Sequence, residues 1–393
     1  MSTWETTLPP PPEAPPRPER SRRRWTVALF VGLVVVLVAT VAASRVTLPY
    51  YALVPGDALA VSGLITVPKD KAHPVTGHVL LTDVGVNDVK LLTLVPDWLD
   101  ANTELVKTSE LTGNLPVSEF DGQGNVDMAE SQMTAKAVAL RQLGYQVPEH
   151  DAGVTVYVVD PSSPAWHVLH VGDVITSVDG VATPNPSALV AAIHAHQPGD
   201  QVTLRVGSIA KPAAGHDVTV TLASSVQNGK RVPIVGIGAP TVPIPGMGTQ
   251  PVYDFPFPVQ ISTDGIGGPS AGLAFTLGVI NTLSGGRLTG GHTVAATGTI
   301  HPDGTVGDVG GVAQKTVAVE RAGATLFMVP PQEYAVARSK AGPSLKVVAV
   351  GSLSQAMSVL RAQGGSLGSA SASPSGALGN QGVPADWKDA PWT

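Results

Sequence analysis

The chain has 393 residues, enough for two or three folded domains with proper hydrophobic cores. It contains no cysteine, which excludes disulfide frameworks, thiolate metal sites and cysteine nucleophiles together. Charged residues are only 14% of the chain and the net charge is −6, so the basic surface that nucleic-acid binding requires is lacking and no nucleic-acid partner is expected.

The two ends of the chain have the composition of disordered segments. Residues 1–24 combine runs of proline with five arginines, and residues 364–393 are rich in Gly, Ser, Ala and Pro. We expect a basic lead-in at the first end and an unstructured tail at the second.

Residues 25–43 predict one transmembrane helix, because they are apolar or small except for Thr26 and Thr40. At about 1.5 Å per residue such a helix spans the roughly 30 Å hydrocarbon core. The arginines before it place the N-terminus in the cytoplasm and the rest of the chain outside, as a single-pass protein of the cell membrane. A signal peptide cleaved after Ala43 is the alternative, and it also exports the chain.

The exported part predicts a mixed α+β protein. Residues 44–149 contain short strand-like runs and a helix, at 60–67, 78–84 and 128–143, with an apolar stretch at 89–99. Residues 150–225 form a compact β-rich module with strands at 154–158, 202–206 and 218–222 and a helix at 187–196. Residues 231–363 begin with a Gly/Pro-rich connector and continue with helices at 270–283 and 312–322 and strands at 293–300 and 325–329.

The densest chemical feature is Asp264-Gly-Ile-Gly-Gly-Pro-Ser-Ala-Gly272, directly before an apolar helix. Ser270 falls at the start of that helix, where unpaired amides and the positive end of the helix dipole stabilise an anion. Such a place suits a nucleophile. The alternative is that Ser270 only caps the helix and the glycines only shape a turn.

Gly268-Pro-Ser-Ala-Gly272 also fits the nucleophile elbow of α/β-hydrolases, whose acid and histidine follow the serine in that order. The later histidines are His292 and His301, and no Asp or Glu lies between Ser270 and either of them. The chain order therefore excludes the elbow.

Lys315 is the candidate base. Helical spacing places it on an apolar face with Val312, Val319 and Ala322. Burial disfavours an ammonium ion, so the lysine pKa would fall until the neutral amine could take the proton of Ser270. A lysine whose stem packs while its amine stays in water is the alternative.

These residues resemble the proteolytic domain of Lon-type peptidases. The resemblance rests on Gly268-Pro-Ser-Ala-Gly272, on Thr297-Gly-Thr-Ile300 with Gly304-Thr-Val306, and on Gly310-Gly311 with Lys315 and Arg321-Ala-Gly323. It implies that Ser270 is the nucleophile and Lys315 its general base, with amides near Gly268, Ser270 and Ala271 holding the oxyanion. Lon enzymes commonly carry Asp three residues before the serine, where this chain has Gly267.

Residues 150–225 resemble a PDZ domain of the kind attached to bacterial proteases, through Ser163-Pro-Ala165, Gly172-Asp-Val-Ile175 and Val178-Asp-Gly180. PDZ domains bind extended chain ends by strand addition. The segment predicted to bind a peptide is Gly153, Val154 and Thr155. With the transmembrane helix, this order of parts resembles the exported, membrane-anchored PDZ-containing Lon-like proteases.

The sequence thus predicts an ATP-independent extracytoplasmic serine endopeptidase that acts on unfolded or PDZ-presented proteins. No Gly-x-x-x-x-Gly-Lys-Ser/Thr loop for an ATPase occurs, and the histidines form no zinc motif, so neither a cofactor nor a metal is expected. The partners are protein or peptide substrates and the membrane, and self-association is left open. The alternative is a proteolytically inactive membrane scaffold whose PDZ module binds protein C-termini or extended segments.

Overall fold

The computed structural model describes residues 20–113, 116–209, 211–227, 229–237, 247–263 and 265–368. The predicted tail beyond residue 368 and the lead-in before residue 20 lie outside these ranges. So does Asp264, the first residue of the serine motif.

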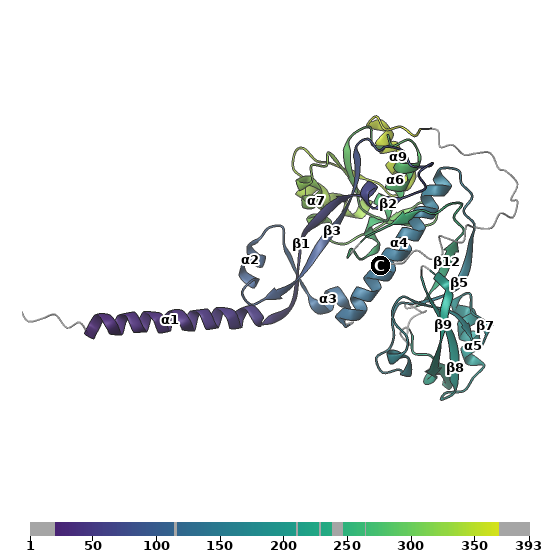
Figure 1. Ribbon diagram of the computed structural model, residues 1–393, viewed down its shortest axis with the longest axis horizontal. Coiled ribbons are helices and arrows are strands. Elements are labelled where there is room, and N and C mark those ends of the chain that lie inside the picture. The colour runs from purple at the N-terminus through teal and green to yellow at the C-terminus, as the bar shows by residue number, and fades with distance from the viewer. Residues whose placement is uncertain are drawn as a thin grey trace, which may run out of the picture.

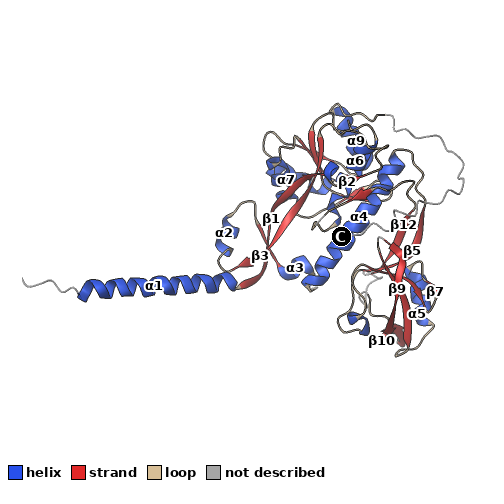
Figure 2. Ribbon diagram, viewed as in Figure 1, coloured by secondary structure: helices blue, strands red, loops and turns tan. Residues whose placement is uncertain are grey.

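The described chain is a mixed α+β protein, as predicted (Figure 2). The helices are α1 (Arg20–Arg45), α2 (Leu94–Leu99), α3 (Thr108–Thr112), α4 (Val117–Gln142), α5 (Pro186–His194), α6 (Gly272–Leu283), α7 (Val312–Arg321), α8 (Tyr334–Lys340) and α9 (Leu353–Ala362), with short 3-10 helices η1 (Val61–Gly63), η2 (Pro164–His167), η3 (Pro269–Ala271) and η4 (Pro331–Glu333). The strands are β1 (Thr47–Ala60), β2 (Ile65–Thr66), β3 (His78–Lys90), β4 (Glu104–Lys107), β5 (Glu149–Val156), β6 (Asp173–Val178), β7 (Val181–Ala182), β8 (Gln201–Ser208), β9 (Lys211–Thr221), β10 (Ala223–Gln227), β11 (Lys230–Ile234), β12 (Met247–Tyr253), β13 (Gln260–Ile261), β14 (Thr293–Ala296), β15 (Thr299–Ile300), β16 (Val306–Gly307), β17 (Leu326–Val329) and β18 (Lys346–Ala349).

Helix α1 projects away from the folded part of the molecule as a single rod (Figure 1). Its stretch Trp25–Arg45 has a mean hydropathy of 2.7, and none of the most apolar part is buried against the rest of the chain. Length and composition make it a candidate membrane span, and a signal sequence has the same properties. The helix begins at Arg20, so the last arginines of the predicted lead-in are helical.

The larger folded body is built on a six-stranded sheet in the order β18-β17-β14-β3-β1-β4. The pairs from β18 to β3 are parallel, and β1 pairs with β3 and β4 in the antiparallel sense. Strands from before residue 110 and after residue 290 therefore share one sheet.

Both faces of this sheet are covered, because successive side chains of a strand point to opposite faces. In β3, Val79 and Leu81 belong to the core beneath α4, α6 and α9, whereas Leu80 between them belongs to the core beneath α7 and α8. Strands buried on both sides read as continuous apolar runs. This explains why 325–329 could be recognised as a strand from its sequence.

The smaller body contains the sheet β12-β5-β6-β8-β9, with β7 beside β6 and helix α5 packed against it. Strand β8 alternates between exposed and buried residues, as expected for a sheet with one face in water. Helix α4 runs between the two bodies and contacts both (Figure 1).

Four predicted elements differ from the structure. The strand predicted at 293–300 is divided into β14 and β15, which belong to different sheets. The strand predicted at 60–67 is interrupted by η1. Helix α4 begins at Val117 instead of residue 128, because its first half, which contains Gly122 and Gly124, has little apolar periodicity and is held by packing on both bodies. The predicted connector after residue 231 contains β11 and β12, and β12 pairs with the distant β5.

Candidate functional site

The glycines of the serine motif have separate physical roles. Gly268 has φ of +87°, a backbone conformation that residues with a Cβ rarely adopt. Pro269 then starts η3, and α6 follows from Gly272. A Cβ on Gly272 would lie 2.9 Å from the Ile300 amide nitrogen, so only glycine allows this close approach. Together they hold Ser270 in a tight turn at the start of a fully buried helix.

The structure brings Ser270 and Lys315 together. Lys315 lies on α7, and its Nζ donates to Ser270 Oγ at 2.8 Å. The same amine donates to Thr297 Oγ1 at 3.4 Å. Lys315 is only 3% exposed, so its amine does not reach into water as the alternative for this residue required.

The surroundings of Lys315 favour its neutral form. Burial lowers the pKa of Lys315 to about 8, because the ammonium ion loses its hydration. Asp83 and Glu333 act in the opposite direction on this pKa through their negative charge. With this pKa about one amine in ten is deprotonated at pH 7 and able to accept a proton.

Side chains outside the motif hold the turn in place. The carbonyl of Ser270 accepts hydrogen bonds from the Gly298 amide at 2.9 Å and from Thr297 Oγ1 at 3.2 Å. Ser131 Oγ on α4 donates to the Pro269 carbonyl at 3.0 Å. The turn that carries Ser270 is thus fixed on one side by the segment after β14 and on the other by α4.

The two predicted oxyanion residues flank Ser270, but one of them is already engaged. The Gly268 amide donates to the Gly124 carbonyl of α4 at 2.7 Å, so it is not free to bind an oxyanion in this arrangement. Ala271 is buried within η3. The oxyanion role of Gly268 and Ala271 stays a prediction, and in this arrangement the Gly268 amide is already bonded to Gly124.

Position 267 lies beside the backbone of helix α4. A Cβ on Gly267 would lie 3.4 to 3.6 Å from the backbone of Gly124, in ordinary contact. The carboxylate that Lon enzymes commonly carry here would have to fit between the turn and α4. The departure from the Lon pattern thus coincides with a helix that passes close over the nucleophile turn.

The predicted peptide-binding segment Gly153, Val154 and Thr155 lies in β5, and β5 is paired on both sides. Val154 and Thr155 pair with β6 along one edge and with β12 along the other. Strand addition needs an open edge. A peptide therefore cannot add to β5 at these residues, because both of its edges are already paired. The outer strand at this end of the sheet is β12.

Four residues that act on the Ser270–Lys315 pair have no role that the sequence alone indicates, namely Thr297, Ser131, Asp83 and Glu333. Thr297 lies in one of the motifs that resemble Lon-type peptidases, and its side chain hydrogen-bonds both the Ser270 carbonyl and the Lys315 amine. Ser131 and Asp83 come from segments far from the serine along the chain. No local pattern could indicate that Ser131 bonds to the turn or that the charge of Asp83 acts on Lys315.

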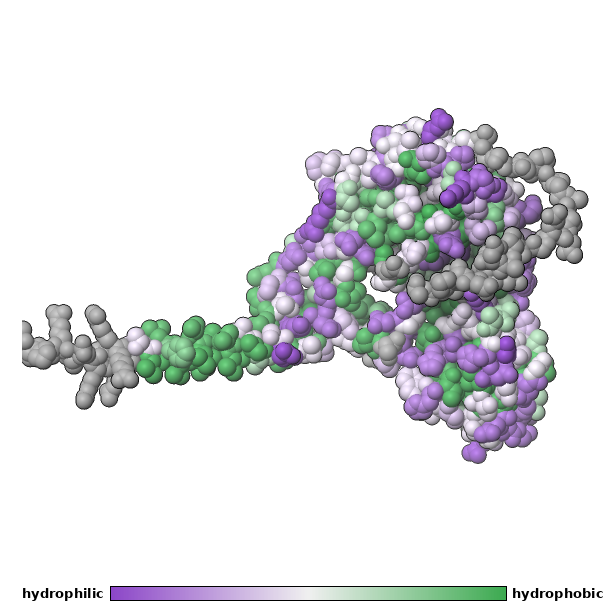
Figure 3. All heavy atoms as spheres, viewed as in Figure 1, coloured by the Kyte–Doolittle hydropathy of each residue, from purple (hydrophilic) through white to green (hydrophobic). Residues whose placement is uncertain are grey.

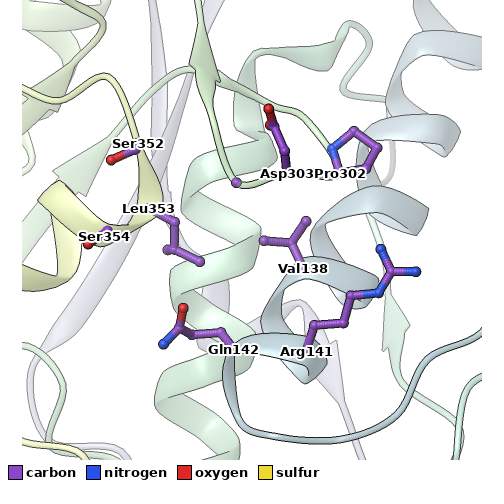
Figure 4. A pocket seen from close by; sticks show the side chains of 9 residues that line it. Val138, Arg141, Gln142, Pro302, Asp303, Ser352, Leu353 and Ser354 are labelled. Carbon is purple, nitrogen blue, oxygen red and sulfur yellow. The ribbon is translucent and has the colours of Figure 1, made fainter.

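A cavity of about 310 Å³ lies at the far end of α4 (Figure 4). It is lined by Val138, Arg141, Gln142, Pro302, Asp303, Gly304, Ser352, Leu353 and Ser354. Neither Ser270 nor Lys315 belongs to it, so we do not place the candidate chemistry there. Among the residues that the structure describes, no group of three His, Asp or Glu side chains is arranged to hold a metal ion.

Two protein families match parts of this chain. The C-terminal proteolytic domain of Lon protease (S16) matches residues 263–364, which include Ser270 and Lys315. The PDZ domain family matches residues 142–212. The chain joins a PDZ domain to a Lon-type proteolytic domain. The PDZ domain contains β5, and the Lon-type domain contains the Ser270 turn and α7.

Solved structures similar to the PDZ domain come from two Listeria proteins. The PDZ domain of the SdrC-like protein of Listeria monocytogenes is 29% identical over 22% of this chain and 85% of its own, with a TM-score of 0.19. That of Listeria innocua is 27% identical over 22% of this chain and 90% of its own, also with a TM-score of 0.19. None of the curated proteins matches this chain.

Proposed function

We propose that this protein is a serine endopeptidase in which Ser270 is the nucleophile and Lys315 its general base. The observation that carries the proposal is the 2.8 Å contact between Lys315 Nζ and Ser270 Oγ, made by a buried amine whose pKa is lowered to about 8. A nucleophile and a base within hydrogen-bonding distance, with the base tuned toward the working pH, form the minimal acyl-transfer site.

The proposed reaction begins with neutral Lys315. Its lone pair accepts the hydroxyl proton as Ser270 Oγ bonds to the scissile carbonyl carbon, and the resulting ammonium then gives this proton to the leaving amine. Water hydrolyses the acyl-enzyme, with Lys315 again accepting and returning a proton. Thr297 positions the amine through its hydroxyl.

Stabilisation of the oxyanion requires a small movement in this proposal. The Gly268 amide is bonded to Gly124, so η3 and α4 must separate slightly before this amide can face a substrate carbonyl. The same contact favours a second candidate function, that of an inactive scaffold in which α4 keeps the turn closed.

We further propose that hydrolysis needs no ATP and that substrates are unfolded or presented by the PDZ domain. The sequence contains no Gly-x-x-x-x-Gly-Lys-Ser/Thr loop, the motif on which an unfolding ATPase depends. Helix α1 would hold the N-terminus in the cytoplasm and the rest of the chain outside, since the arginines precede it. In this division residues 44–149 and 231–363 form the proteolytic unit around an inserted PDZ domain at 150–225.

The test is proteolysis by the full chain in lipid nanodiscs, without nucleotide, on the unfolded protein β-casein. Mass spectrometry would count new peptide N-termini for the unchanged protein, for Ser270→Ala and for Lys315→Met. We expect termini only with the unchanged protein. Termini that persist with Ser270→Ala would contradict the proposal, and a folded but silent unchanged protein would favour the scaffold.

A further inference from the structure

An exposed apolar surface adjoins the end of α1. It consists of Val46, Leu91, Leu92, Val95, Trp98 and Leu99, here named the end patch. Trp98 is 72% exposed and Leu99 68% exposed, values unusual for large apolar side chains of a folded domain. Most other exposed large hydrophobic residues described after α1 are scattered singly. Figure 3 shows the hydrophobic surface continuing from α1 onto the adjoining end of the folded part.

Backbone pairing holds the end patch beside the helix exit. Val46 follows the last residue of α1, and its carbonyl accepts a hydrogen bond from the Leu91 amide at 3.0 Å. Thr47 pairs with Lys90 at the end of the sheet. The turn that carries Leu91 and Leu92 therefore lies beside the C-terminal end of α1. Helix α2, which follows this turn, lies there too (Figure 1).

Helix α2 presents its apolar residues on one side. At about 100° per residue, Leu94, Val95, Trp98 and Leu99 fall within one arc of about 140°, and Asp97 falls outside it. The carboxylate of Asp100 is occupied by the Asn102 amide and the Thr103 hydroxyl. The two carboxylates of this segment, Asp97 and Asp100, thus do not interrupt its apolar side.

The end patch is also fixed to the Lon-type domain. Lys340 Nζ on α8 donates to the Ala101 carbonyl at 2.8 Å, directly after α2. A surface that is held in place and left apolar must be covered by something apolar. Its position beside α1, with an exposed tryptophan among its residues, matches the composition of protein segments that lie in the membrane–water interface.

We infer that the end patch lies in the lipid–water interface of the membrane that α1 crosses, as a second and shallow membrane contact. This inference rests on the proposed membrane anchoring by α1. It implies that the Lon-type domain sits on the bilayer at a defined orientation, with the PDZ domain at the other end of the folded part, away from α1 (Figure 1).

The absence of cysteine makes the test direct, because one introduced cysteine takes one label. Full-length Val95→Cys, Trp98→Cys and Leu99→Cys would each carry a nitrobenzoxadiazole fluorophore in nanodiscs holding one protein copy. The lipids would bear a nitroxide quencher either near the carbonyl end of their acyl chains, for the patch positions, or near the methyl end, for position 35. Val35→Cys within α1 and Val181→Cys on β7, 62% exposed, are the matched controls.

We expect loss of emission at positions 95, 98 and 99 and none at position 181. Quenching at position 35 without quenching at the three patch positions would overturn the inference and leave the anchor intact. A lack of quenching at position 35 would overturn both. Patch labels that are shielded from nitroxide lipid and from aqueous iodide alike would show that protein covers the patch, which also contradicts the inference.

Discussion

Two lysines of this chain have a lowered proton affinity for the same reason, yet they lie in different surroundings. Burial lowers the pKa of Lys315 on α7 and of Lys136 on α4 to about 8. The amine of Lys136 lies over the Phe255 ring, 5.2 Å from its centre, whereas that of Lys315 contacts Ser270 and Thr297. A lowered lysine pKa therefore marks a desolvated amine, and only the neighbouring hydroxyl turns it into a candidate base.

The largest expected effect is on the rate of proteolysis, which should depend on Lys315 and not on Lys136. Ser270→Ala and Lys315→Met should each reduce proteolysis to background, because either change removes one half of the reacting pair. Lys136→Met should keep activity within about twofold, since its amine touches no reacting group. The measurement is the rate of new N-terminus formation from β-casein. Equal losses in all three variants would break the comparison.

The pH dependence should follow Lys315 alone. Activity needs the neutral amine, so kcat/KM should rise about tenfold per pH unit below 8 and level off above it. Lys136→Met should give the same profile. An activity that is flat or highest in acid would contradict the role of Lys315 as base.

The position of Ser270 relative to Lys315 can be disturbed by a substitution that removes neither side chain. In Gly272→Ala the new Cβ would lie 2.9 Å from the Ile300 amide nitrogen and 3.0 Å from Ser131 Oγ, so η3 must shift. We expect a loss of about 1–3 kcal/mol in the free energy of unfolding and a marked fall in kcat. Gly63→Ala is the control, because its Cβ would meet no atom within 4 Å. Urea titration and peptide hydrolysis measure the two effects, and equal behaviour of both variants would refute the packing argument.

The last prediction concerns how the free energy of unfolding depends on pH through Lys315. Between about pH 8 and 10.5 the unfolded chain binds a proton at Lys315 that the folded chain has released, so the stability of the folded state rises with pH in this window. Below pH 8 the buried ammonium destabilises the fold. Lys315→Met should therefore stabilise the protein at pH 7, by on the order of 1–3 kcal/mol, and this gain should fade toward pH 10.5. Urea unfolding at several pH values tests this, and a gain independent of pH would contradict it.

Local patterns predicted a large part of this molecule. The apolar run of α6, the helix of α7 and the buried strand at 325–329 follow from hydrophobic periodicity, and the structure has these elements within a few residues. Ser270 and Lys315 were chosen as a pair, and they lie in contact. The early start of α4 was missed, because its first half is stabilised by packing more than by its own apolar pattern.

The sequence by itself indicated many of the helices and strands, the glycines that shape the turn at Ser270, and a hydroxyl and an amine with the chemistry to react. These depend on side-chain period, backbone conformation and residue chemistry, all of which are local. The tertiary structure decided that β12 occupies the edge of β5 and that Gly124 engages the Gly268 amide. A backbone amide or a strand edge is chemically the same in every sequence, so its partner depends on which distant segment the fold brings beside it.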